Sequence, residues 1–152
     1  MVMNYRGVEA PKIAEPQSLK VEDYMAKKLV TFNPDQPMFE VVGALMKHRI
    51  SGGPVVNKNG DLVGIVSEGD CLKEVVKGKY HNIPIFSGMV SDHMAKKVIT
   101  VNPGLNILEA ARMFLQMRFR RFPVVDNEGR LVGQISQKDV MKAVLAIKSS
   151  TW

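Results

Sequence analysis

The chain alternates between continuous apolar runs and segments in which apolar residues recur every three or four positions. Two of the recurring segments predict amphipathic helices, because this spacing places the apolar side chains on one helix face. Their apolar positions are Met38, Val41, Val42, Leu45 and Met46 in the first segment, and Ile107, Leu108, Ala111, Phe114 and Leu115 in the second. The apolar runs 62–67 and 131–136 predict strands, and their continuity indicates burial on both faces.

Breaks between these segments predict the other elements. Asn-Pro pairs at 33–34 and 102–103 each end a β-branched run, because the residue before proline is disfavoured in the helical region. Gly60 and Gly129 stand in turns where a positive φ is wanted, which indicates hairpins, and Pro37 suits the first position of a helix. The remaining predicted elements are helical starts at 21–25 and 90–94, first strands at 29–32 and 98–101, hairpin strands at 54–57 and 123–126, and closing helices from 68 to about 77 and from 137 to about 148.

The predicted elements occur twice in the same order at a constant spacing. Val90 stands 69 positions after Val21, and the same offset relates Asp70 to Asp139 without a gap. Two copies are too few for a solenoid, which needs at least about three. We therefore expect an α/β (α+β) fold in which two β-α-β-β-α copies cover each other's apolar faces with pseudo-twofold symmetry.

This repeat divides the chain into four predicted parts. Residues 19–76 form the first repeat, 77–89 a linker and 90–148 the second repeat. Residues 1–18 are polar and contain two prolines, so they are expected to form an extended or partly mobile arm.

Composition narrows the class of protein. The chain has 152 residues, of which 45% are hydrophobic and 24% charged, as in ordinary globular domains. The single cysteine, Cys71, excludes an internal disulfide and fits a reducing compartment. No apolar run approaches the roughly 18 residues that span a bilayer, and the first residues lack the apolar core of an export signal. These features predict a soluble cytoplasmic protein.

The formal charge of +6 raises the question of an anionic partner. The lysines are scattered along the chain, which is typical of a solvated surface. Arg118, Arg120 and Arg121 form the one tight cationic cluster in the sequence. A nucleic-acid-binding surface and an ordinary basic surface both stay open at this point.

Each closing helix begins with a Ser-x-x-Asp sequence, Ser67 to Asp70 and Ser136 to Asp139. A serine at a strand-to-helix junction is a natural N-cap, and an acidic residue three positions later completes a capping box. The same position also suits a ligand, because free N–H groups at a helix start attract phosphate and a carboxylate accepts hydrogen bonds from ribose hydroxyls. The two roles are compatible, and the residues alone do not separate them.

Catalytic and metal chemistry find little support. The histidines, His48, His81 and His93, occupy non-equivalent repeat positions and have no ligand-like spacing with Cys71, so no metal site is expected. Neither a Gly-x-Ser-x-Gly elbow nor a Walker loop occurs, so we expect no catalytic residues and no enzyme. Cys71 is either a thiol of lowered pKa at a helix start or a small buried hydrophobe, as Val140 is at the equivalent position.

Three motifs recur in order and in register in both copies. They are the Thr-x-x-Pro strand starts at 31–34 and 100–103, the Pro-Val-Val strands at 54–56 and 123–125, and the Gly-x-x-Ser-x-x-Asp junctions at 64–70 and 133–139. In these motifs the chain resembles a tandem CBS-domain pair, or Bateman module, from about residue 19 to 147. The resemblance implies two clefts between the copies that bind adenine nucleotides, further pairing into a disc-shaped dimer, and a ligand-sensing rather than catalytic role.

The resemblance also implies which residues contact the nucleotide. In each cleft, the Thr of one copy faces the Ser-x-x-Asp of the other, with Asp on the ribose and Ser on the phosphate. The implied main cleft contains Thr31, Ile50, Ser51, Arg120, Arg121, Ser136 and Asp139. The implied second cleft contains Thr100, Phe119, Ser67 and Asp70. Family members commonly place a cation two residues before the proline of the Pro-Val-Val strand, where this chain has Arg121 in one copy and Gly52 in the other. The main cleft is therefore expected to bind more tightly, unless the arginines are simply a solvated turn.

We thus expect a regulatory module that senses AMP, ADP or ATP, the last with magnesium, with no covalent cofactor. It is expected to form a homodimer and to act on an unidentified protein partner, without a membrane and without nucleic acid. Two alternatives stay open, a basic nucleic-acid-associated protein and a purely structural dimerisation module. NAD and S-adenosylmethionine are further candidate ligands.

Overall fold

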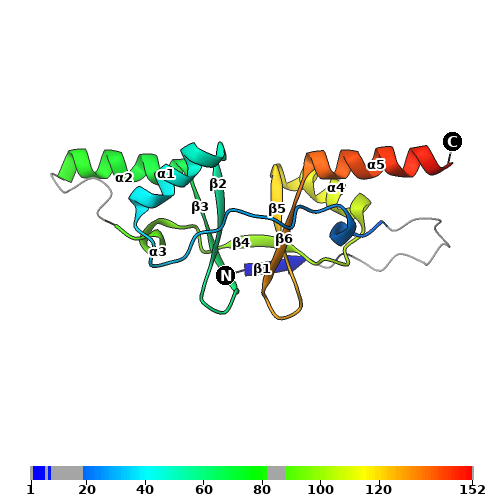
Figure 1. Ribbon diagram of the computed structural model, residues 1–152, viewed down its shortest axis with the longest axis horizontal. Helices are drawn as coiled ribbons and strands as arrows, with labels where there is room; N and C mark the ends of the chain where they lie inside the picture. Colours follow the sequence, from blue (N-terminus) through cyan, green and yellow to red (C-terminus); the bar gives the residue numbers. More distant parts are fainter. Residues whose placement is uncertain (1, 6, 8–18, 82–87, 152) are drawn as a thin grey trace. The chain divides into compact units, whose positions relative to one another are not determined.

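The computed structural model describes residues 2–5, 7, 19–81 and 88–151. They form two compact units (Figure 1). Unit 1 comprises Met1–Val2 and Val30–Val98, and unit 2 comprises Met3–Leu29 and Ile99–Trp152.

The start of each sequence repeat belongs to the unit built mainly from the other repeat. In unit 2, the N–H of Val21 donates to the carbonyl of Leu105 at 2.9 Å, and Ala26 and Gln134 exchange two backbone hydrogen bonds of 2.9 Å. In unit 1, Ala95 and Ile65 exchange the equivalent pair of hydrogen bonds, at 2.8 and 3.0 Å. Each unit is therefore completed by a segment from the opposite repeat.

Unit 1 is built around a two-stranded antiparallel sheet. Its strands are β2 (Gly52–Val56) and β3 (Leu62–Ser67), and its helices are α1 (Met38–His48), α2 (Glu68–His81) and α3 (Val90–His93). Gly60 has a φ of +84° in the connecting turn, as predicted for the hairpin. Helix α2 continues through His81, so it extends into the predicted linker, of which residues 82–87 lie outside the described part of the chain.

Unit 2 repeats this plan with a larger sheet. Its helices are η1 (Val21–Asp23), α4 (Ile107–Met117) and α5 (Gln137–Thr151). Its sheet has the order β1-β4-β5-β6, formed by β1 (Val2–Tyr5), β4 (Val98–Val101), β5 (Arg121–Val125) and β6 (Leu131–Ser136). Residues 2–5 of the predicted arm are extended, as predicted, but they form a sheet strand beside β4 rather than a mobile arm. Residues 8–18 of that arm lie outside the described residues.

The predicted first strand at 29–32 is wrong in length, whereas its equivalent at 98–101 is confirmed as β4. In both copies only one residue pair bridges to the hairpin in parallel, Phe32 with Val55 and Val101 with Val124. The difference is the second neighbour, because β1 pairs along the other edge of β4. Without such a neighbour, the segment that contains Phe32 makes a single bridge rather than a strand.

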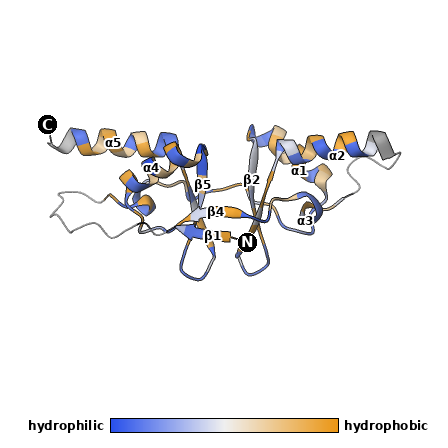
Figure 2. Ribbon diagram, turned by 180° about the vertical axis from the view of Figure 1, so that it is seen from behind, coloured by the Kyte–Doolittle hydropathy of each residue, from blue (hydrophilic) through white to orange (hydrophobic). Residues whose placement is uncertain are grey.

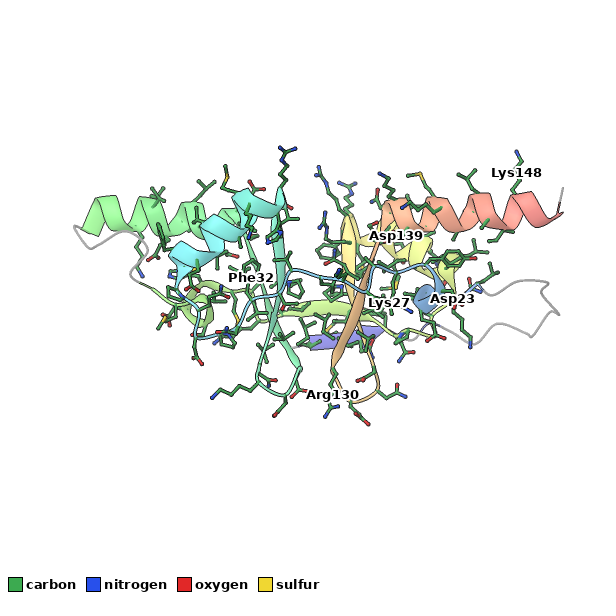
Figure 3. The ribbon with its side chains drawn as sticks, in the orientation of Figure 1. Asp23, Lys27, Phe32, Arg130, Asp139 and Lys148 are labelled. Carbon is green, nitrogen blue, oxygen red and sulfur yellow. The ribbon has the colours of Figure 1, made fainter. Side chains whose placement is uncertain are left out.

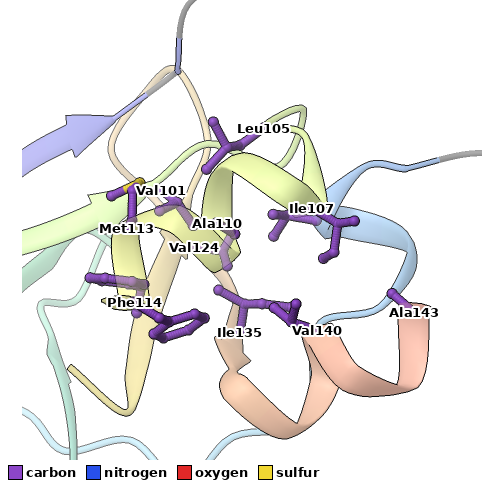
Figure 4. Close-up of a cluster of buried hydrophobic side chains, with 12 residues drawn as sticks. Val101, Leu105, Ile107, Ala110, Met113, Phe114, Val124, Ile135, Val140 and Ala143 are labelled. Atoms are coloured by element: carbon purple, nitrogen blue, oxygen red, sulfur yellow. The ribbon is translucent and has the colours of Figure 1, made fainter. Parts of the chain in front are cut away.

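The core of unit 2 lies between its sheet and the helices α4 and α5 (Figure 4). Ile107, Ala110 and Phe114 from α4 pack with Val124 and Ile135 of the sheet, and all are less than 5% exposed. In unit 1, Met38, Val41 and Leu45 of α1 form the corresponding cluster. The two amphipathic helices are therefore confirmed.

Two predictions about burial are wrong. Residues along β3 alternate between buried and half-buried, and β6 follows a similar pattern, so these strands are not fully buried on both faces as their unbroken apolar sequence suggested. Met46, Leu108 and Leu115, assigned to the core-facing stripe, are 76%, 56% and 84% exposed. At about 100° per residue, these positions lie well round the helix from the buried ones, which are Met38, Val41 and Leu45 in α1 and Ile107, Ala110, Met113 and Phe114 in α4.

These exposed apolar residues recur at equivalent positions of the two repeats. Figure 2 shows hydrophobic segments along the helices of both units. The matched exposed positions are Phe39 and Leu108, Met46 and Leu115, Leu72 and Met141, Val75 and Val144, and Val76 and Leu145. Each unit therefore carries the same apolar outer helix face.

Candidate functional site

The junction between β6 and α5 is held by reciprocal hydrogen bonds. The backbone N–H and the hydroxyl of Ser136 each donate to Asp139 Oδ2 at 2.9 Å, and the N–H of Asp139 donates to Ser136 Oγ at 3.2 Å. This is the predicted capping box, and it places Asp139 in the first turn of α5 (Figure 3). The capping role of this pair is confirmed.

Unit 1 contains the same junction between β3 and α2. The backbone N–H and the hydroxyl of Ser67 donate to Asp70 Oδ2 at 2.8 and 3.1 Å. In both pairs Oδ2 carries these bonds, and Oδ1 accepts no hydrogen bond from another described residue. Both carboxylates are only half-buried. Each junction therefore retains an acceptor oxygen that capping does not use.

The arginine cluster lies next to the Ser136–Asp139 junction, at the start of the neighbouring strand β5 and in the residues just before it. Arg121 pairs with Ser136 in the antiparallel register of β5 and β6, and the N–H of Gln137 donates to the carbonyl of Arg120 at 3.2 Å. Arg118, which ends α4 in the left-handed conformation, Arg120 and Arg121 are exposed. Within the described chain, none of these guanidinium groups forms a salt bridge. The positive charge beside the Ser136–Asp139 junction is therefore uncompensated.

The equivalent backbone of unit 1 lacks these charges. Gly52 pairs with Ser67, and the N–H of Glu68 donates to the carbonyl of Ser51 at 2.9 Å. A Cβ at Gly52 would lie 2.7 Å from the carbonyl oxygen of Val66, so a side chain there requires the backbone to shift. The two junctions thus share a scaffold and differ in the residues that a phosphate would meet.

The two predicted threonines have opposite environments. Thr31 is exposed and lines an open hollow between residues 31–35 and 56–59. Thr100 is 0% exposed, and its hydroxyl donates to the carbonyl of Met3 at 2.9 Å and lies 3.3 Å from Asn4 Oδ1. The equivalence that the sequence repeat predicts for these threonines therefore fails at the level of their contacts.

Each predicted cleft draws on both units. Of the predicted main set, Thr31, Ile50 and Ser51 lie in unit 1, whereas Arg120, Arg121, Ser136 and Asp139 lie in unit 2. Of the predicted second set, Ser67 and Asp70 lie in unit 1, whereas Thr100 and Phe119 lie in unit 2. Within unit 2 the structure brings Arg121 to the Ser136–Asp139 junction, and within unit 1 it brings Ser51 to Ser67. The joining of these groups into two clefts stays a prediction.

One segment beside the Ser136–Asp139 junction was not among the predicted site residues. Ala26 pairs with Gln134, two residues before Ser136, and a Cβ at Gly133 would lie 2.5 Å from Met25 Sδ and 2.8 Å from the carbonyl oxygen of Ala26. The sequence signal for this segment is the identical stretch Met-Ala-Lys-Lys at 25–28 and 94–97, together with the glycines at 64 and 133. The predicted helical starts end at residues 25 and 94, so residues 26–28 and 95–97 had no predicted element.

The remaining candidate groups have structural roles. Burial raises the pKa of the Cys71 thiol, and the negative charge of Asp70 raises it further. The side chain lies in the unit 1 core, so of the two interpretations of Cys71 the small buried hydrophobe is confirmed. His93 Nε2 lies 2.8 Å from Glu74 Oε2, and the N–H of Gly88 donates to the other oxygen of the same carboxylate at 3.3 Å. Among the described residues, no group of three or more His, Cys, Asp or Glu side chains is arranged to hold a metal ion. No helix in the described residues has the length and apolar character needed to span a membrane.

Comparison with known proteins identifies relatives of the whole repeat. The CBS domain model matches the chain twice, over residues 21–77 and 90–146. The protein MJ1426 of Methanocaldococcus jannaschii is 31% identical over 156 aligned residues, which cover 82% of this chain and 90% of that protein. The chloroplastic CBS domain-containing protein CBSX2 of Arabidopsis thaliana is 28% identical, with 86% of this chain and 66% of CBSX2 covered. The chain spans only 44% of another archaeal relative, MJ0188.

Solved structures share the fold. A crystal structure of CBSX2 in complex with AMP matches with a TM-score of 0.74 and 32% identity, covering 86% of this chain and 99% of that one. The CBS domain pair of MJ0100, in complex with 5′-methylthioadenosine and S-adenosyl-L-methionine, matches with a TM-score of 0.65 and 25% identity, covering 84% and 96%. The family match falls on both sequence repeats and their junctions, and the chain therefore belongs to the CBS domain family as a tandem CBS pair.

Proposed function

We propose that this CBS pair is a regulatory module that binds a phosphate-bearing adenine nucleotide through the Ser136–Asp139 junction and Arg121. The observation that carries the proposal is the arrangement in unit 2, where an exposed guanidinium stands across the sheet from a junction with an unused carboxylate oxygen. The AMP complex of the 32% identical CBSX2 supports this choice of ligand class.

The two oxygens of Asp139 allow capping and binding at the same time. Oδ2 holds the start of α5, whereas Oδ1 is available to accept a hydrogen bond from a ribose hydroxyl. Arg121 and Arg120 supply forked donors for phosphate, which keep their charge at all physiological pH values. Thr31, Ile50 and Ser51 complete the proposed main site, as the family resemblance implied. The second proposed set is Thr100, Phe119, Ser67 and Asp70.

Charge favours AMP, ADP or ATP over the ligands of MJ0100. Methylthioadenosine carries no phosphate, and S-adenosylmethionine, despite its carboxylate, has a net positive charge, so neither brings the net negative charge that a phosphate would bring to the arginines. ATP would bring magnesium with it, bound to its phosphates rather than to a cluster of protein carboxylates.

The nucleotide class is tested by isothermal titration calorimetry of the chain with AMP, ADP, ATP, S-adenosylmethionine and adenosine. We expect saturable binding of the phosphate-bearing ligands, and weaker binding of adenosine and S-adenosylmethionine. Equal affinities for adenosine and AMP would remove the proposed role of the arginines. Binding of none of the five would contradict the proposed function itself and favour a purely structural module.

We further propose that the exposed apolar helix faces pair two copies of the chain. Leu72 and Val76 on α2, and Met141 and Leu145 on α5, are each at least half exposed, and the two pairs stand at equivalent positions. Contiguous exposed apolar side chains are typical of an association surface. Sedimentation of the Leu72→Glu and Leu145→Glu double variant tests this pairing, with a monomer expected where the unaltered chain is a dimer.

As a sensor, the module would act on a protein partner by binding its ligand more tightly in one arrangement than in another. It has no catalytic role in this proposal. None of the relatives named above is described as binding nucleic acid, so the nucleic-acid alternative gains no support. A cytoplasmic location stays a prediction, and CBSX2 is a chloroplastic protein.

A further inference from the structure

The first four described residues cover a side chain that the nucleotide-binding proposal requires. Thr31 and Thr100 occupy the same position in the two repeats, yet Thr31 is exposed and Thr100 is fully buried. Within the described residues the Thr31 hydroxyl makes no hydrogen bond, whereas the Thr100 hydroxyl donates to the carbonyl of Met3. The difference between the two threonines is therefore made by β1.

The contact with β1 uses the binding capacity of the Thr100 hydroxyl. A threonine hydroxyl has a single proton to donate. That proton lies within reach of the Met3 carbonyl at 2.9 Å and of Asn4 Oδ1 at 3.3 Å. The family resemblance has this threonine face the Ser-x-x-Asp of the other repeat, so a ligand that accepts a hydrogen bond from its hydroxyl would compete with β1 for the same proton.

The attachment of β1 is limited. It lies at the edge of the sheet, beside β4 (Figure 1). It has four residues, all of them half-buried rather than buried. The carbonyl of Tyr5 accepts from the N–H of Asn102 at 3.0 Å, and the Tyr5 side chain packs against the edge of the unit 2 core. Short peripheral elements of this kind open at a lower free energy than core strands.

Gly7, two residues after the end of β1, has a backbone conformation and surroundings that suit only glycine. Gly7 has a φ of +76°, and a Cβ there would lie 2.7 Å from Leu105 Cδ1 and 3.3 Å from Glu109 Cγ. A β-branched residue at this position would meet both the strained backbone and these side chains. Gly7 therefore offers a way to weaken β1 without removing it.

We propose that β1 is an intrasteric gate over the second nucleotide set, Thr100, Phe119, Ser67 and Asp70. With β1 in place, Thr100 is withheld and only the set that contains Thr31 and Asp139 binds nucleotide. Release of β1 frees Thr100 and opens the second set. A closed gate lowers the apparent affinity in proportion to the small fraction of molecules in which it is open. This inference rests on the proposed function, because it assigns regulation to the same class of site.

The test compares AMP binding to the full chain and to a chain lacking residues 2–7, by isothermal titration calorimetry. We expect one tight site in the full chain and two in the shortened chain, with the second at least about tenfold tighter than any second event in the full chain. In the shortened chain, Thr100→Val is expected to remove the gained site alone, and Thr31→Val to remove the original site alone.

Two additions keep the test decisive if the shortened chain folds poorly. In the full-length chain, Gly7→Val is expected to increase the affinity of the second AMP-binding site. In the unaltered chain, high AMP concentrations are expected to speed hydrogen exchange at the amides of residues 3–5. One site in both chains, or two equal sites in both, would overturn the gate and leave the proposed function standing. No AMP binding in either chain would overturn both.

Discussion

Ser136 and Asp139 cap the start of α5 through reciprocal hydrogen bonds. The N–H of Ser136 donates to Asp139 Oδ2 at 2.9 Å, and the N–H of Asp139 donates to Ser136 Oγ at 3.2 Å. This box uses one oxygen of the carboxylate and leaves Oδ1 to a ligand. Capping and binding are therefore separable by substitution, because an amide retains one acceptor oxygen and loses the other.

Asp139→Asn is expected to weaken AMP binding by about 1.5–3 kcal/mol, the range for a hydrogen bond that involves a charged group. Asp139→Ala is expected to lose the same affinity and also about 1 kcal/mol of folding free energy, since the cap disappears with the carboxylate. Calorimetry gives the first quantity and urea denaturation the second. Asp70→Asn is the matched control, because it alters the equivalent cap outside the main set. Unchanged AMP affinity in Asp139→Asn would exclude the ribose contact.

Arg121→Gly reproduces in the second repeat the residue that the first repeat has at Gly52. We expect AMP binding to weaken about tenfold or more and to become less sensitive to salt, because a charge-assisted hydrogen bond to phosphate is lost. Adenosine binding should not change. Arg130→Gln, which removes an exposed charge in the turn of the β5–β6 hairpin, is the control for net charge (Figure 3). A similar loss of AMP affinity in Arg130→Gln would mean that Arg121 acts only through the overall positive charge of the protein.

The Cys71 thiol makes stability depend on alkaline pH. Burial and the charge of Asp70 raise its pKa above the ordinary value of 9.0, so the folded chain holds a proton that the unfolded chain releases. The contribution is complete below about pH 9 and is lost as the pH rises through the raised pKa. Urea denaturation of the unaltered chain and of Cys71→Val, which copies Val140, isolates this effect. Curves that stay parallel from about pH 8 to 10 would contradict it.

The contact between Glu74 and His93 is expected to stabilise unit 1. Glu74 is 3% exposed, and its carboxylate lies 2.8 Å from His93 Nε2 and accepts from the N–H of Gly88 at 3.3 Å. Glu74→Ala leaves these donors without an acceptor, so we expect a loss of about 2–3 kcal/mol in urea denaturation.

The Arg112–Glu109 pair provides the matched comparison. Its atoms are 3.6 Å apart and Arg112 is largely exposed, so Glu109→Ala is expected to cost no more than about 0.5 kcal/mol. Equal losses in the two variants would show that burial adds nothing to the Glu74 interaction.

Local sequence patterns predicted the elements whose causes are local. The helix spacing of Met38, Val41 and Leu45, the turn glycines, and the Ser-x-x-Asp caps all act within a few residues, and the structure has each of them. The family resemblance placed Arg121 in the same cleft as Ser136, and the structure pairs these two residues in the hairpin register, although the predicted strand began only at residue 123.

What could not be predicted depends on contacts between distant segments. Strand β1 has no periodicity of its own and is stabilised by β4, so that Met3 and Thr100 meet across 97 positions of sequence. For the same reason, the sequence does not reveal that the start of each repeat joins the unit built mainly from the other repeat. Ala26, for example, pairs with Gln134 rather than with a residue of its own repeat. Leu115 is exposed because the buried stripe of α4 runs through Ile107, Ala110 and Phe114, and the many apolar residues of this helix do not by themselves indicate which stripe faces the sheet.

The most direct measurement is the melting temperature of the chain with and without AMP, since a ligand that binds only the folded state stabilises it by about 2.7 kcal/mol at one hundred times its dissociation constant. The account predicts a rise that grows with AMP concentration and is lost in the Asp139→Asn, Arg121→Gly double variant. An unchanged melting temperature at saturating concentrations of AMP, ADP and ATP would contradict it.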